Sequence, residues 1–211
     1  MHAPPTDSQD LDVESFATPL QQRRFATAMQ RLAASRTPGA PVRVYVSAAP
    51  RTVDNPKWDN WLAQITQDLP DSAEVLHYRS VFTDDQPYDW DTVAGEIDGL
   101  VVVGKQKRAG SRVYRFGPVA RLELRSLIAQ KPVLLYAHSQ GLIPVIDCQS
   151  QVLTQGGTPR LKLIAPKRWN QESATLQAAL RALGPAQGET TEEERTVAPR
   201  HLAHPFVTPP R

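Results

Sequence analysis

Two kinds of hydrophobic periodicity alternate along this chain. Short continuous or β-branched apolar runs are typical of buried strands, whereas apolar positions that recur every three or four residues are typical of helices. The runs predict strands over residues 42–48, 73–78, 98–104, 131–137, 142–147 and 160–164. The helical spacing predicts helices over residues 19–35, 56–69, 90–97, 118–130 and 171–183.

The alternation of strands and helices indicates the fold class. Residues 98–104 are almost uninterruptedly apolar, which favours burial on both faces, as in parallel sheets covered by helices. We therefore expect an α/β fold, a three-layer α/β/α arrangement with a mainly parallel, flavodoxin/Rossmann-like sheet. It should occupy residues 41–185. A flexible leader and one helix should precede it over 1–40, and a disordered tail should follow over 186–211, because both ends are polar and rich in proline.

The composition indicates the size of the core, the cellular compartment and the absence of a membrane span. The chain has 211 residues, enough for one ordinary core, and a single cysteine, Cys148, which predicts a reducing, cytoplasmic compartment. No apolar run reaches the length of about 20 residues that spans a bilayer, and the first residues lack the features of a signal peptide. We expect a soluble protein without a membrane partner. No spacing matches a metal site or a dinucleotide or phosphate fingerprint, so no cofactor is expected.

A basic segment follows the third predicted strand. Five Lys and Arg residues lie between Lys105 and Arg115, beyond the carboxyl end of a strand, where open α/β sheets bind ligands. The planar fork of arginine suits phosphate or carboxylate. We expect Arg108, Ser111 and Arg115 to hold such a group, with a solvated basic loop as the alternative. Nucleic acid is not expected as a partner, because the net charge is only +2 and the positive charge is confined to one loop.

Glu123 is the sharpest candidate for chemistry. It lies in the first turns of the predicted helix 118–130, beside the expected crevice. A carboxylate there can attack the anomeric carbon of a bound sugar and divide glycosyl transfer into two easier steps. The alternative is a glutamate on the helix surface, paired with Arg121 or Arg125.

Three segments together resemble motifs of the nucleoside 2-deoxyribosyltransferase-like family. They are Tyr45-Val46-Ser47-Ala48-Ala49-Pro50, Asp98-Gly99-Leu100-Val101-Val102-Val103, and Gly117 to Glu123 followed by Lys131-Pro132-Val133. The resemblance covers about residues 42–137 and implies a hydrolase or transferase that acts on a nucleoside or nucleotide, with Glu123 as nucleophile. Gly117 stands where the family has an aspartate. The resemblance also allows a homo-oligomer, since family members often complete the pocket with a neighbouring subunit.

Four other residues are candidates for the site. Asp98 is a second catalytic candidate, with backbone capping as its alternative role. Tyr45 and Ser47 are expected to line the base or sugar pocket, and Gly117 to contact substrate at the start of the helix.

Two other functions compete with the glycosidic one. The segment Ala137-His138-Ser139-Gln140-Gly141 resembles the nucleophile elbow of α/β-hydrolases, but Pro144 intrudes where the helix of the elbow should run. A non-catalytic module that senses a nucleotide or joins an assembly is the main alternative.

Overall fold

The computed structural model describes residues 18–81, 89–128, 130–138, 140–155 and 157–186. The predicted leader therefore lies outside the described residues up to position 17, and the predicted tail lies outside them from position 187. Within the described ranges, no helix combines the length and the apolar character that crossing a bilayer requires.

A five-stranded, mainly parallel sheet forms the centre of the fold. Its strand order is β2-β1-β3-β6-β7, and the first four strands are parallel while β7 is antiparallel to β6. These strands are β1 (Val42–Ala48), β2 (Ala73–His77), β3 (Gly99–Val103), β6 (Val133–Ala137) and β7 (Gly141–Pro144). The expectation of a mainly parallel α/β sheet is confirmed.

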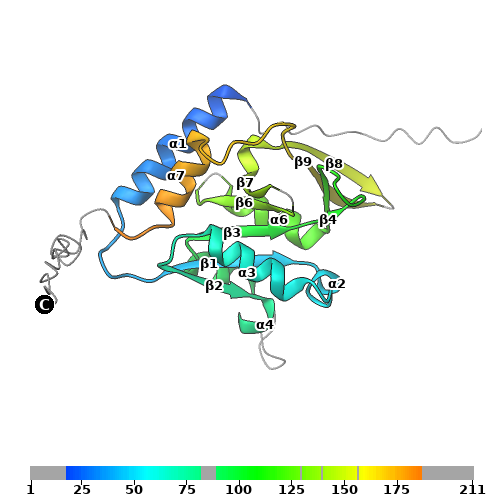
Figure 1. Ribbon diagram of the computed structural model, residues 1–211, viewed down its shortest axis with the longest axis horizontal. Helices are drawn as coiled ribbons and strands as arrows, with labels where there is room; N and C mark the ends of the chain where they lie inside the picture. The colour runs from blue at the N-terminus through cyan, green and yellow to red at the C-terminus, as the bar shows by residue number, and fades with distance from the viewer. Residues whose placement is uncertain (1–17, 82–88, 129, 139, 156, 187–211) are drawn as a thin grey trace, which may run out of the picture.

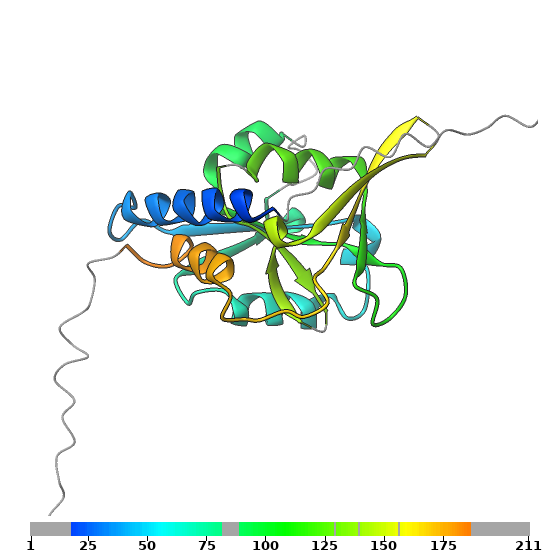
Figure 2. The same ribbon diagram turned by 90° about the horizontal axis from the view of Figure 1, so that it is seen from above.

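Helices cover both faces of this sheet because side chains alternate along its buried strands. Val44, Val101 and Leu134 face a core shared with three helices, whereas Leu100 and Leu135 face a second core shared with two others. The first group of helices is α1 (Pro19–Ala34), α3 (Trp58–Asp68) and α7 (Ala174–Ala182), and the second is α5 (Trp90–Glu96) and α6 (Pro118–Leu127). α1 and α7 pack against each other (Figures 1 and 2).

Short helical segments complete the connections. They are α2 (Pro50–Val53), α4 (Tyr78–Val81) and the 3-10 turn η1 (Val145–Asp147). The predicted strand 142–147 therefore ends at Pro144 and continues as η1. Among the described strands it is the last of the sheet, next to β6, and such an edge position is where a strand tolerates proline.

A second, four-stranded sheet was not expected from the sequence. Its order is β4-β5-β9-β8 and all of its pairs are antiparallel. The strands are β4 (Lys105–Gln106), β5 (Val113–Phe116), β8 (Gln149–Gln155) and β9 (Thr158–Ile164). The predicted basic loop is thus the β4–β5 hairpin. It folds as strands because Tyr114 and Phe116 alternate with polar neighbours and bury their rings against α6 and the central sheet.

Gly104 joins the two sheets at a point of close approach. A Cβ atom at this position would lie 2.5 Å from Cζ of Phe116, so the ring of Phe116 occupies the space that any other residue would need. The absence of a side chain lets β4 leave the end of β3 directly over this ring.

Candidate functional site

Glu123 lies on the buried side of α6. The helix begins after its N-cap, Gly117, with Pro118 in the first turn, where the missing N–H of proline costs nothing. Leu124 and Leu127 are buried along the same helix, and only 2% of Glu123 is exposed. The alternative of a glutamate on the helix surface is therefore wrong.

Ser47 connects Glu123 to the end of β1. Its Oγ donates a short hydrogen bond to Oε2 of Glu123, and Ser47 is itself buried. β1, β2, β3 and β6 are parallel, so their carboxyl ends share one edge, which is where α/β sheets bind ligands. The structure brings these two predicted site residues together at that edge.

Tyr45 completes a buried group of three side chains. It lies two residues before Ser47 on β1 and therefore on the same face. Burial raises the pKa of Tyr45 well above its ordinary value, and the nearby Glu123 and Tyr78 raise it further. The phenol consequently stays protonated at neutral pH beside the carboxylate. The ring of Trp90 lies against Tyr45, with the ring centroids 6.1 Å apart, and fixes its orientation.

Asp98 lies at the amino ends of the parallel strands, directly before β3, and so at the end of the sheet opposite to Glu123. Its Oδ2 accepts a hydrogen bond from the backbone N–H of Arg43 at 2.8 Å, and its Oδ1 lies 3.7 Å from Nη2 of Arg36. Arg43 precedes Ser47 by four residues, which is about 13 Å along a strand. Asp98 was expected as a second catalytic residue, but the structure does not bring it together with Glu123: its carboxylate holds the start of β1 and the segment after α1, in the capping role that was its alternative.

Lys131, the lysine of the family-like motif, is also at that opposite edge. Its Nζ donates hydrogen bonds to the carbonyl oxygens of Ala94 and Ile97, at 2.7 and 2.5 Å. Burial lowers its pKa, although the charge of Asp98 opposes this. Lys131 therefore satisfies carbonyl groups at the C-terminal end of α5, a structural role.

The basic segment does not converge on Glu123. Arg108 and Arg115 are exposed, and Oγ of Ser111 accepts a hydrogen bond from the N–H of Val113 at 3.1 Å inside the hairpin. Arg115 stands between two buried aromatic residues on β5, so strand alternation directs it to the face that points away from α6. A phosphate held by these side chains would not lie beside Glu123. Gly117 is the N-cap of the helix that carries Glu123, but it precedes Glu123 by six residues, which is about 9 Å along the helix axis.

His138 follows β6 at the carboxyl edge and is surrounded by aromatic rings. Its ring centroid is 4.5 Å from that of Trp61, 5.2 Å from that of Tyr136 and 6.1 Å from that of Tyr114. Burial lowers the pKa of His138, and its Nδ1 has no hydrogen-bond partner among the described residues. Ser139 lies outside the described residues. The chain after it forms β7, not the helix that a nucleophile elbow requires.

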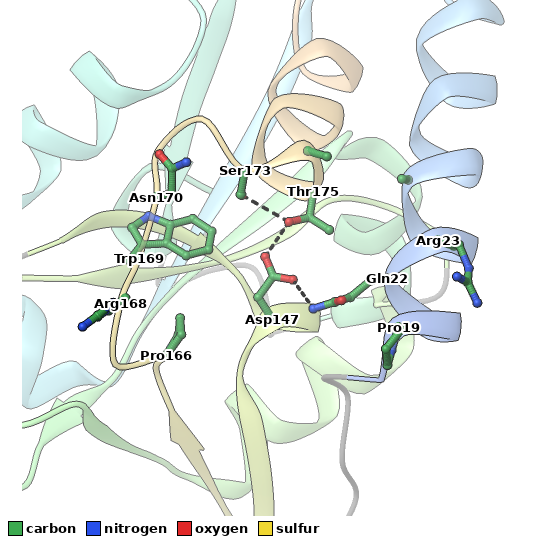
Figure 3. A pocket seen from close by; sticks show the side chains of 12 residues that line it. Pro19, Gln22, Arg23, Asp147, Pro166, Arg168, Trp169, Asn170, Ser173 and Thr175 are labelled. Carbon is green, nitrogen blue, oxygen red and sulfur yellow. Dashed lines mark hydrogen bonds between the residues drawn. The ribbon is translucent and has the colours of Figure 1, made fainter.

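A cavity of about 540 Å³ lies between α1, η1 and residues 166–175 (Figure 3). Asp147 lines it and accepts hydrogen bonds from Nε2 of Gln22 at 2.9 Å and from Oγ1 of Thr175 at 2.5 Å. Burial raises the pKa of Asp147, and these two bonds oppose the rise. Sequence reasoning missed this site, because the residues that form it are far apart along the chain. None of the predicted site residues is among those that line it.

Among the residues that the structure describes, no group of three His, Cys, Asp or Glu side chains is placed to hold a metal ion. Comparison of the chain with protein-family models, with curated proteins and with solved structures found no match. The resemblance to the nucleoside 2-deoxyribosyltransferase-like family therefore rests on its motifs.

Proposed function

We propose that this protein cleaves or transfers the N-glycosidic bond of a nucleoside or nucleotide, with Glu123 as the nucleophile. One observation carries the proposal: the carboxylate of Glu123 is buried and bonded to Ser47 at the carboxyl edge of a mainly parallel sheet. A carboxylate in that place has the chemistry needed to attack a sugar carbon.

The proposed reaction proceeds in two displacements. A carboxylate oxygen of Glu123 attacks C1′ of the sugar, the bond from C1′ to the base nitrogen breaks, and the base leaves with the electron pair and takes up a proton from solvent. Water or a second base then attacks C1′ of the glycosyl ester and releases the carboxylate. Ser47 orients Glu123 through its hydrogen bond, and the protonated phenol of Tyr45 offers a donor to the sugar or to the carboxylate.

The proposal also covers the fold class, the cellular compartment and the oligomeric state of the protein. The helices on both faces of the central sheet support a three-layer, flavodoxin/Rossmann-like class for this part of the fold. The buried Cys148 supports a reducing, cytoplasmic compartment. A second copy of the chain that completes the pocket is part of the same proposal.

A non-catalytic binding module is the second candidate, and the depth of Glu123 favours it. Because only 2% of the residue is exposed, a sugar reaches the carboxylate only after covering side chains move. A glutamate that simply ties α6 to β1 through Ser47 would need no such access.

A base-release assay distinguishes the glycosidase or transferase from the binding module. The protein is incubated with nucleosides, nucleotides and NAD, and chromatography detects any free base. The glycosidic proposal predicts release by the parent protein, its loss in Glu123→Gln, and its retention in Glu172→Gln, which makes the same change at an exposed residue. Circular dichroism verifies that Glu123→Gln is folded, and Ser47→Ala, expected to release base more slowly, provides a second variant. Tight binding without release, unchanged in Glu123→Gln, would contradict the proposal and support the binding module.

A further inference from the structure

The positive charge of the chain is concentrated in two segments without any acidic residue. Residues 99–122 and 148–171 contain ten of the 24 Lys and Arg residues and none of the 22 Asp and Glu residues. The rest of the chain has 14 cations against 22 acids, a net charge of −8. The overall net charge of +2 therefore conceals a strongly uneven distribution.

The second sheet brings these two segments together. Lys105 on β4 is opposite Arg115 on β5, Arg115 is opposite Lys162 on β9, and Lys162 is opposite Gln151 on β8. Directly opposite residues lie on one face, so the three cations form a row about 10 Å long across three strands. Arg160 lies two residues before Lys162 and adds a further cation to the same face. We call this surface the cationic face.

The cationic face points outward. The residues that alternate with its cations, such as Tyr114, Leu161 and Leu163, are buried in the core beneath, whereas Lys105, Arg115 and Arg160 are exposed. The distal ends of β8 and β9 project past the rest of the described fold in both views (Figures 1 and 2). The expectation that the positive charge is confined to one loop is therefore wrong, because pairing with β9 spreads it over a sheet.

Like charges directly opposite each other destabilise an antiparallel sheet. Lys105 with Arg115 and Arg115 with Lys162 are two such pairs, and β4, β5, β8 and β9 contain no acid to offset them. The Nζ of Lys162 donates a hydrogen bond to Oε1 of Gln151 at 2.7 Å, which holds this side chain through a neutral partner. A bound polyanion would relieve this repulsion.

We propose that the cationic face binds the sugar–phosphate backbone of double-stranded nucleic acid without regard to sequence. A duplex presents about one negative charge per 1.7 Å of its axis, a density that suits closely spaced cations, and arginine grips phosphate with two parallel hydrogen bonds. Binding of single strands usually relies on exposed aromatic rings that stack on bases. The strands of the cationic face that the structure describes carry their aromatic residues, Tyr114 and Phe116, on the buried side, which favours backbone contacts to a duplex.

Fluorescence anisotropy with a labelled duplex of arbitrary sequence tests the proposal on the full-length protein. The test variant is Arg115→Gln/Lys162→Gln. The control is Arg24→Gln/Arg31→Gln, which removes the same charge from exposed positions of α1. The logarithm of the affinity falls linearly with the logarithm of the salt concentration, and each lost phosphate contact makes this slope shallower by about 0.9. At about 0.1 M salt, one lost contact corresponds to roughly an eightfold loss of affinity. The test variant should therefore bind roughly 60-fold more weakly, with no loss of thermal stability, because it also removes like-charge repulsion.

Several outcomes would overturn the inference. They are equal affinity of the parent and the test variant, an equal loss in the α1 control, tighter binding of the single strand than of the duplex, and displacement of the duplex by polyglutamate at matched charge. Glu123→Gln should leave duplex binding unchanged, so the cationic face and the glycosidic proposal fail or succeed separately.

Discussion

Replacement of Asp98 by alanine distinguishes a structural carboxylate from a catalytic one. The substitution removes the acceptor of the hydrogen bond from the backbone N–H of Arg43; such bonds to charged groups contribute about 1.5–3 kcal/mol. It also removes the ion pair with Arg36. The carboxylate is 34% exposed, so that pair adds only about 0.5–1 kcal/mol. The side chain of Arg36 is 7% exposed but keeps a hydrogen bond to the carbonyl oxygen of Ala182 at 2.7 Å, which limits the cost of its unpaired charge.

Together these contributions predict that Asp98→Ala lowers the free energy of unfolding by about 2–4 kcal/mol. For a chain of this size that corresponds to a melting temperature lower by roughly 4–16 °C. Asp71→Ala, which removes an exposed acid from the turn before β2, should stay within about 0.5 kcal/mol of the parent. Asp98→Asn keeps an acceptor for Arg43 and should recover part of the loss.

Urea unfolding followed by circular dichroism measures these differences, and the base-release assay accompanies it on the same variants. The structural role predicts lower stability with base release per folded molecule unchanged. The reasoning is refuted if Asp98→Ala is as stable as Asp71→Ala, or if it abolishes base release while stability stays intact.

Ionisation and packing elsewhere give two more tests. Because burial raises the pKa of Asp147 above 3.8, its stabilising contribution is complete below that pH and is lost as the pH rises through the raised pKa. Urea unfolding should therefore show that the free energy of unfolding of Asp147→Asn rises relative to that of the parent as the pH increases from 4 to 7. A difference between the two proteins that does not change with pH would contradict this. Gly104→Ala places Cβ against Phe116 and should cost about 1–3 kcal/mol. Gly95→Ala in α5 meets nothing within 4 Å and should gain about 0.5–1 kcal/mol, so equal unfolding midpoints would refute the packing argument.

Local pattern was sufficient to predict the central sheet and its helices. β1 has the predicted bounds, Val42–Ala48, and α1 ends one residue before the predicted end. β3 and β6 are apolar along their whole lengths and buried on both faces, so their continuous apolar runs were enough to predict them as buried strands. The Thr18 capping box and Pro118 in the first turn of α6 are local signals of the same kind.

The second sheet escaped prediction because it depends on pairing between distant segments. β8 reads Gln-Ser-Gln-Val-Leu-Thr-Gln, and its polar residues become a strand only when β9 pairs with them. The same pairing places Lys162 beside Arg115, 47 positions apart in the chain. The sequence alone therefore placed the positive charge in a single loop, whereas the folded chain spreads it over one face of the second sheet.

The candidate site was predictable to the extent that strand direction determines it. Ser47 and Glu123 meet because a residue near the end of a parallel strand faces the helix that covers it. Asp98 does not join Glu123 because an acid before a parallel strand lies at the amino end of the sheet, opposite to the end that holds Glu123. The cavity around Asp147 depends on how α1 packs, which residue spacing alone does not specify.

Mass spectrometry of the protein denatured during turnover tests the central claim most directly. A substrate whose glycosyl ester breaks down slowly should leave a sugar attached to the peptide that contains Glu123, with one equivalent of free base released, and Glu123→Gln should carry no such adduct. Base release without any adduct on Glu123, or an adduct on another residue, would contradict the role that we propose for this carboxylate.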